Sequence, residues 1–228
     1  MSHQLAARIA GFLFLISTSS YMYADTILSP LLRLPDFLNQ AAQNQSTLAL
    51  ASLLEFINCA AVVGIAIVIY PIIKRYSERV AIGYIAGRVI EAAMLTSGAV
   101  MLMTFGAMGE KLAVSSVMHS EQLYIMGSAL KTERYFSFLM GMIALAIFGF
   151  LLNITLFKYR LVPRVLAGLG LLGYVMLLLK VLFDFFGVSM GGAWMYIPGG
   201  LFELLLPLWL IFRGFDLSVE PQVGTSGK

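Results

Sequence analysis

Residues 79–105 read RVAIGYIAGRVIEAAMLTSGAVMLMTF, and Gly87-Arg88-Val89-Ile90-Glu91 places an arginine and a glutamate near the middle of this apolar run. The run is long enough to cross a bilayer as a helix, which needs about 20 residues. A charged side chain near the centre of a spanning helix costs roughly 2.5–3.5 kcal/mol on insertion scales. Such residues therefore face protein or water, and the stretch predicts a membrane helix with a buried polar centre.

The composition of the whole chain agrees with this prediction. The 228 residues are 60% hydrophobic and only 12% charged, whereas about a quarter of the residues of a soluble domain are charged. The strict alternation of apolar and polar residues that marks the strands of a membrane barrel is absent. We therefore predict an all-α integral membrane protein that crosses the cell membrane several times, with the lipid bilayer as its surroundings.

Six apolar segments have spanning length, and we expect a bundle of six transmembrane helices in a single domain over residues 1–215. A polar tail, residues 216–228, follows it and is expected to be disordered. The expected helices cover about 6–28, 48–73, 79–106, 135–157, 163–187 and 192–213.

The basic residues between these segments predict the orientation. Residues 74–79 carry three basic residues, and residues 158–164 carry three more. Short connections rich in lysine and arginine stay in the cytoplasm. Because the number of crossings is even, both the N-terminus and the C-terminus are predicted to be cytoplasmic.

The connection at 107–134 leaves two alternatives open. Its apolar residues Val114, Met118, Ile125 and Ala129 fall on approximately one helical face. The segment is either an interfacial helix that covers the bundle as a lid or a helical connector without that role, and we favour the connector.

The deepest charged residues are Arg88, Glu91 and Glu203. At 1.5 Å per residue, Arg88 lies about 13 Å and Glu91 about 18 Å from the basic end of their helix, and Glu203 lies about 16 Å from the opposite end of its own. All three are therefore near one depth. Arg88 can pair with Glu203 or with Glu91, its i,i+3 neighbour.

Two further polar pairs lie toward the opposite, outer side. Glu55 and Asn58 are i,i+3 neighbours, and Lys180 and Asp184 are i,i+4 neighbours. The acids outnumber the cations at membrane depth, and a neutral buried acid can change its protonation. We predict an outward-facing polar cavity whose ligand-binding or proton-linked residues include these four together with Arg88, Glu91 and Glu203.

Several function classes find no support in the sequence. There is no metalloprotease, hydrolase, phosphate-loop or Cys-x-x-Cys motif. One cysteine, Cys59, and two histidines, His3 and His119, argue against a multi-cysteine or three-histidine metal centre, and we expect no cofactor. The net charge of +3 is too small and scattered for nucleic-acid binding.

Four stretches of the chain carry a pattern that can be compared with known families. They are Ala7–Ile16, Gly87–Ala92, Tyr159–Leu166 leading to Gly170, and Glu203 through Trp209 to Phe215. Together they resemble one bacterial membrane family, described as domain of unknown function 4386. The resemblance covers nearly the whole chain, and the Leu-Val-Pro-Arg turn is its most specific element. It implies a prokaryotic multi-pass membrane protein and no particular activity, and the family's pattern includes Arg88, Glu91 and Glu203.

The sequence leaves three functions open. The first is binding or transport of a small polar or amphiphilic ligand, lipid included, with Arg88 as the anion anchor. The second is a non-catalytic structural or regulatory subunit whose buried ion pairs only fix helix packing, as a homo-oligomer or with a partner membrane protein. In that case Gly168, Gly170 and Gly173 mark a helix-packing face. The third, ranked last, is a membrane enzyme that uses Glu91 and Glu203 as acid and base.

Overall fold

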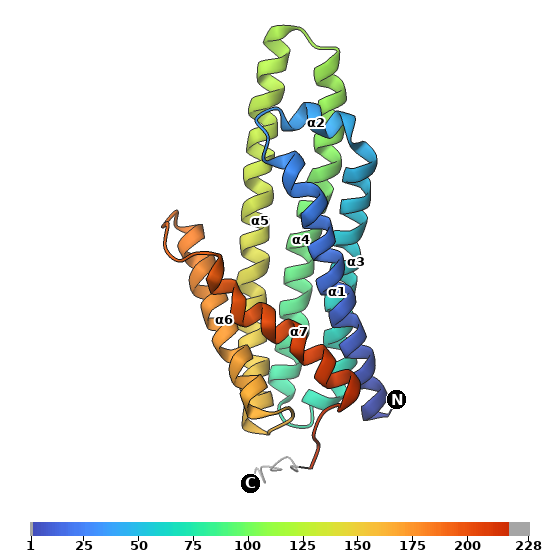
Figure 1. Ribbon diagram of the computed structural model, residues 1–228, viewed down its shortest axis with the longest axis vertical. Coiled ribbons are helices and arrows are strands. Elements are labelled where there is room, and N and C mark those ends of the chain that lie inside the picture. Colours follow the sequence, from blue (N-terminus) through green and yellow to red (C-terminus); the bar gives the residue numbers. More distant parts are fainter. Residues whose placement is uncertain (1, 219–228) are drawn as a thin grey trace, which may run out of the picture. The chain divides into compact units, whose positions relative to one another are not determined.

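A computed structural model describes residues 2–218, apart from the side chains of Val117 and Met118. This part of the chain is all-α, and six of its helical segments are long and apolar enough to cross a membrane. The elements are α1 (His3–Leu32), α2 (Phe37–Gln43), α3 (Gln45–Ile73), α4 (Glu78–Ala113), α5 (Val117–Lys158), α6 (Arg164–Phe185), the 3-10 helix η1 (Ala193–Tyr196) and α7 (Ile197–Phe212) (Figure 1).

The helices differ most from the expected ones where we predicted the connection at 107–134. Helix α4 continues to Ala113 and α5 begins at Val117, so the connection is a helical connector made of the ends of these two helices. The segment contains no proline and many good helix formers, and nothing stops either helix where its apolarity falls. With 42 residues, α5 is about 63 Å long and exceeds the hydrocarbon core of a bilayer.

Two predicted features include residues whose structure or side chains are not described. The predicted tail lies outside the described residues from 219 onward, as does the side chain of Met118 on the predicted apolar face. Of the other residues on that face, Val114, Ile125 and Ala129 are exposed.

The chain forms two compact units. Unit 1 is made of the described parts of Met1–Leu15, Val62–Ile90 and Met142–Lys228. Unit 2 is made of Ile16–Ala61 and Glu91–Gly141. Helices α1, α3, α4 and α5 each contribute residues to both units, whereas α6, η1 and α7 belong to unit 1 and α2 to unit 2.

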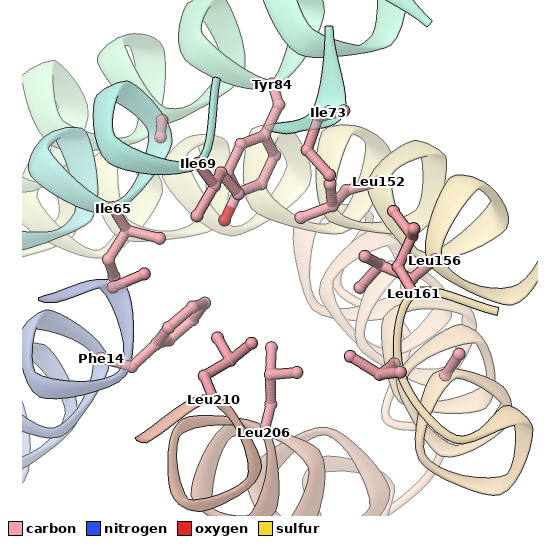
Figure 2. Close-up of a cluster of buried hydrophobic side chains, with 14 of the residues drawn as sticks. Phe14, Ile65, Ile69, Ile73, Tyr84, Leu152, Leu156, Leu161, Leu206 and Leu210 are labelled. Carbon is pink, nitrogen blue, oxygen red and sulfur yellow. The ribbon is translucent and has the colours of Figure 1, made fainter. Parts of the chain in front are cut away.

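Unit 1 has an apolar core to which six helices contribute residues, namely α1, α3, α4, α5, α6 and α7. Figure 2 shows Phe14, Leu206 and Leu210 pointing into the core from one side, with the ring of Tyr84 beside Ile69 and Ile73 on the opposite side. Helices α6 and α7 lie side by side in this unit (Figure 1).

The N-terminal helix, the two basic connections and the C-terminal segment meet at one end of unit 1. This arrangement is compatible with an even number of membrane crossings, and the cytoplasmic location of both termini stays a prediction. The contacts are Arg75 Nη1 to His3 Nε2 at 3.3 Å, the rings of Tyr76 and Tyr159 with centroids 4.9 Å apart, and Asp216 N–H to the Leu161 carbonyl oxygen at 2.8 Å.

Unit 2 has its own core, built around α2. The side chain of Leu38 is fully buried in it, and Phe37 packs edge-on against Phe105 of α4 with ring centroids 5.5 Å apart. A side chain at Gly109 of α4 would place its Cβ 2.9 Å from the Cβ of Ala42, so this glycine permits the close approach of α2. The connection that contains α2 is therefore folded against the long helices of its unit.

Candidate ligand-binding cavity

Unit 2 contains a cavity of about 360 Å³ whose lining comes from the helices α1, α3, α4 and α5 and from Arg33, which follows α1. Helix α1 contributes a single face with the spacing i, i+4, i+8, namely Tyr21, Asp25 and Ser29. The cavity therefore follows from residues that are far apart in the sequence and share one helical face within each element. The remaining charged and polar lining residues are Arg33, Glu55, Asn58, Lys131 and Arg134.

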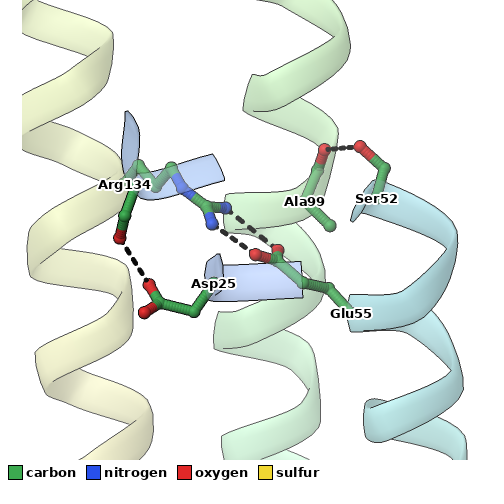
Figure 3. A network of polar contacts seen from close by, with 6 residues as sticks. Asp25, Ser52, Glu55, Ala99 and Arg134 are labelled. Carbon is green, nitrogen blue, oxygen red and sulfur yellow. Dashed lines mark hydrogen bonds and ion pairs between the residues drawn. The ribbon is translucent and has the colours of Figure 1, made fainter. Parts of the chain in front are cut away.

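The strongest interaction in the cavity is an ion pair between α5 and α3. Arg134 Nη1 donates to Glu55 Oε2 at 3.1 Å, and Arg134 Nη2 donates to Glu55 Oε1, so the pair is bidentate (Figure 3). Gly98 of α4 makes room for it, because a Cβ at this position would lie 2.9 Å from Arg134 Nη1. Planar bidentate pairing fixes the guanidinium in place more firmly than a single hydrogen bond would.

Hydrogen bonds between helices hold Glu55 and Asn58 in position. Ser17 Oγ donates to Asn58 Oδ1 at 2.6 Å and joins α1 to α3. One turn before Glu55, Ser52 Oγ donates to the Ala99 carbonyl oxygen at 3.2 Å and joins α3 to α4 (Figure 3). Both Glu55 and Asn58 are buried, so they form the inner part of the cavity.

The charged side chains nearer the surface of the cavity, Lys131, Asp25 and Arg33, have different surroundings. Lys131 Nζ donates to the Leu32 carbonyl oxygen at the end of α1 and lies 4.9 Å from the centre of the Phe37 ring. Asp25 is exposed and accepts a hydrogen bond from Ser29 Oγ at 3.1 Å. The guanidinium of Arg33 is exposed and has no partner among the residues that the structure describes.

Apolar side chains complete the lining. Tyr21 of α1 and Phe138 of α5 stack at 6.4 Å with an angle of 10° between their rings, and Met94 and Leu95 of α4 also line the cavity. An apolar wall that carries a few fixed polar groups is typical of a small-molecule site.

The structure divides the predicted site residues between the two units. Glu55 and Asn58 line the cavity together, as their spacing on one helix predicted. Lys180 and Asp184 of α6 form the expected i,i+4 ion pair, in unit 1. The lining of the cavity, as far as the chain is described, does not include Arg88, Glu91 or Glu203.

Arg88, Glu91 and Glu203 differ in their surroundings. Arg88 is buried in unit 1, donates from Nε to the hydroxyl of Tyr84 at 2.9 Å and lies over that ring. Glu91 is buried in unit 2, and Glu203 is half-buried in unit 1. The pairing of Arg88 with Glu91 or with Glu203 stays a prediction.

Arg134 and Lys131 line the cavity but were not among the residues predicted from the sequence. Both lie before residue 135, where we expected α5 to begin, and so they were assigned to a connection. Lys131, Arg134, Tyr135 and Phe138 have the spacing i, i+3, i+4, i+7 of a single helical face. This spacing can be read from the sequence. It would have placed Lys131 and Arg134 on the face of Tyr135 and Phe138 if the expected helix had begun before its apolar part.

Potential metal ligands do not cluster in the part of the chain that the structure describes. Within them, no three His, Cys, Asp or Glu side chains are placed so that they could hold a metal ion together.

Comparison with known proteins identifies the family. A family model described as "Domain of unknown function (DUF4386)" matches residues 9–214. The chain belongs to this family. The match covers all six spanning segments in whole or in large part, and it confirms the resemblance seen in the sequence. Searches of the curated proteins and of the solved structures found no match.

Proposed function

We propose that this family member binds or transports a small polar or amphiphilic ligand in the cavity of unit 2. The observation that carries the proposal is the lining itself, which combines three cations, two acids and a wall of apolar side chains. Its volume of about 360 Å³ falls within the range of small-molecule pockets.

The contacts within the cavity indicate which part of a ligand would go where. Glu55 and Arg134 already satisfy each other, and Lys131 already donates to a carbonyl oxygen. Arg33 and Asp25 are exposed in the lining, and they offer an anionic or zwitterionic group its first charged contacts. The apolar part of the ligand would contact Leu95 and Phe138.

The direction of opening rests on the charge bias of the connections. The cavity lining includes residues of the connections that we predict to lie opposite the basic ones, and so the cavity would open outward. Glu91 and Glu203, which do not line this cavity, are proposed as proton-linked residues.

A second candidate function is a structural or regulatory membrane subunit. The observation that favours it is the pairing of charges inside the protein, Arg134 with Glu55 and Lys180 with Asp184. Ion pairs that satisfy each other completely fix helix packing without any ligand. The two functions differ in whether the cavity holds a molecule.

The experiment that tests the first proposal fills the cavity from α1. Ser29 lines the cavity, whereas Thr26 on the same helix is exposed and does not, and each hydroxyl bonds within α1. We would compare wild type, Ser29→Trp and Thr26→Trp by native mass spectrometry after purification in a mild detergent. A discrete bound mass in wild type and in Thr26→Trp, absent from a folded Ser29→Trp, is the expected result.

Two results of this experiment would contradict the proposal. If wild type carries no bound mass, or if Ser29→Trp retains it, the cavity is not the ligand site. Capture of a stable partner protein by wild type in the same detergent would then support the structural subunit.

A further inference from the structure

Unit 1 contains two neighbouring hollows at its basic end, and both are lined by Pro163 and Trp209. The first has a volume of about 490 Å³ and lies between α6 and α7, where Leu169, Leu205 and Leu208 line it. The second has a volume of about 300 Å³ and lies beside the turn that precedes α6. One hollow is lined mainly by apolar side chains and the other by charged ones.

The apolar hollow faces outward from the helix pair. Val165 and Phe212, which line it, are 87% and 74% exposed. Because α6 and α7 are spanning segments, side chains exposed along them face lipid. From Arg213 back to Leu205 the hollow follows α7 for about 12 Å, close to the depth of one leaflet of hydrocarbon.

The charged hollow carries an excess of cations. Arg160 and Arg164 line it, and Arg213 lies at the end of the apolar hollow. Asp216 is the acid in this lining, and hydrogen bonds from Ser218 lower the pKa of its carboxyl, so it is ionised at neutral pH. Three arginines against one aspartate leave two positive charges for an external anion.

Two local features add to this excess. Arg164 is the first residue of α6, a helix with no acidic residue in its first turn, and a cation there opposes the helix dipole. The Nε1–H of Trp209 is buried and has no hydrogen-bond partner among the described residues. An anion bound here would offset the unfavourable position of the Arg164 charge at the start of α6, and it could accept a hydrogen bond from the Nε1–H of Trp209.

We propose that the two hollows form a site for one anionic diacyl phospholipid, distinct from the cavity of unit 2. An acyl chain lies in the apolar hollow between α6 and α7. The phosphate lies against Arg164 and Arg213 and accepts a hydrogen bond from Trp209. Basic pockets between spanning helices on the cytoplasmic side select anionic headgroups by this combination of charge and depth. The predicted orientation places the site in the cytoplasmic leaflet.

The test uses the full chain in detergent, titrated with phosphatidylglycerol and with phosphatidylcholine of the same acyl chains, and followed by native mass spectrometry. Wild type is expected to bind phosphatidylglycerol about tenfold more tightly than phosphatidylcholine. Arg164→Gln/Arg213→Gln is expected to lose this preference. A matched variant, Arg8→Gln/Arg79→Gln, removes two exposed cations of unit 1 that lie outside both hollows and should keep it.

Trp209→Phe separates lipid recognition from folding, because it removes the unpartnered donor and keeps an aromatic ring in place. We expect the variant to fold normally and to bind phosphatidylglycerol several-fold more weakly. Equal affinity of wild type for the two lipids would overturn the proposal, and so would a preference that survives in Arg164→Gln/Arg213→Gln or disappears in the matched variant. Displacement of the lipid by an excess of inorganic phosphate would indicate a site for a free anion and would also overturn it.

Discussion

Arg134 and Glu55 illustrate how a charge is kept within a spanning segment. Their side chains are 20% and 8% exposed, and two N–H groups of the guanidinium meet the two oxygens of the carboxylate. The removal of both charges from water costs several kcal/mol, and their mutual attraction roughly repays that cost. The pair therefore adds little net stability, whereas either charge left alone is expensive.

We predict that Glu55→Gln lowers the free energy of unfolding by about 3 kcal/mol, because Arg134 loses its counter-ion. Cys59 provides the measurement, since it is the single cysteine and is buried in the same unit. A thiol-reactive dye that reports the exposure of Cys59 on heating should show an earlier transition in the variant.

Two controls accompany this prediction. Glu133→Gln removes an exposed acid of α5 and should shift the transition little. Glu55→Gln/Arg134→Gln removes both charges and should recover most of the loss. A Glu55→Gln protein as stable as Glu133→Gln would show that the pair is not structurally required.

At the scale of the element, the contact of α6 with α7 depends on small residues. A side chain at Gly173 would place its Cβ 2.6 Å from the Cα of Gly199, a distance that no Cβ tolerates without movement of a backbone. Gly170 is buried as well, and Gly168 is half-buried. Helices in a membrane associate largely through such close packing, because burial of apolar surface from lipid gives no gain.

We predict that Gly173→Ala destabilises unit 1 by about 1–3 kcal/mol through overpacking. Gly200→Ala on α7 is the control, because a Cβ there meets nothing within 4 Å. The control should be neutral or slightly stabilising, since alanine favours a helix. Both tryptophans, Trp194 and Trp209, belong to unit 1, so their fluorescence on heating measures the effect. Equal transitions in the two variants would contradict the prediction.

The number of spanning segments and the position of the basic residues together predict how the whole molecule is oriented across the membrane. The N-terminal helix, both basic connections and the C-terminal segment meet at one end of unit 1. The connection between α6 and η1 follows one further spanning segment, and we predict that it lies on the other side of the membrane. From the positive-inside rule we predict that the basic end is cytoplasmic.

We predict that, in a Cys59→Ala background, Ser189→Cys reacts with a membrane-impermeant maleimide added to intact cells and Ser218→Cys does not. Both serines are exposed, so access across the membrane decides the outcome. Ser218→Cys should react once the membrane is permeabilised. Labelling of Ser218→Cys in intact cells would invert the predicted orientation.

The site could be predicted from the sequence only in part. Glu55 and Asn58 were found because a polar pair inside an apolar helix is visible without any knowledge of its neighbours. Arg134 was missed because α5 begins at Val117, well before its apolar part begins at about residue 135. The start of the apolar segment therefore does not coincide with the start of the helix. The predicted anchor, Arg88, contacts Tyr84 within unit 1 and does not line the cavity of the described chain.

The sequence by itself determined the all-α class, the six spanning segments and the family, because these depend on quantities local to the chain. In lipid every backbone polar group must bond within its own helix, and so a sufficiently long apolar run specifies a spanning helix. Only the tertiary structure decided that Arg134 pairs with Glu55, that α2 packs against α4, and that a cavity remains between α1, α3, α4 and α5. These features depend on how helices distant in sequence are rotated and how closely they approach, and close packing of small residues such as Gly98 and Gly109 sets both.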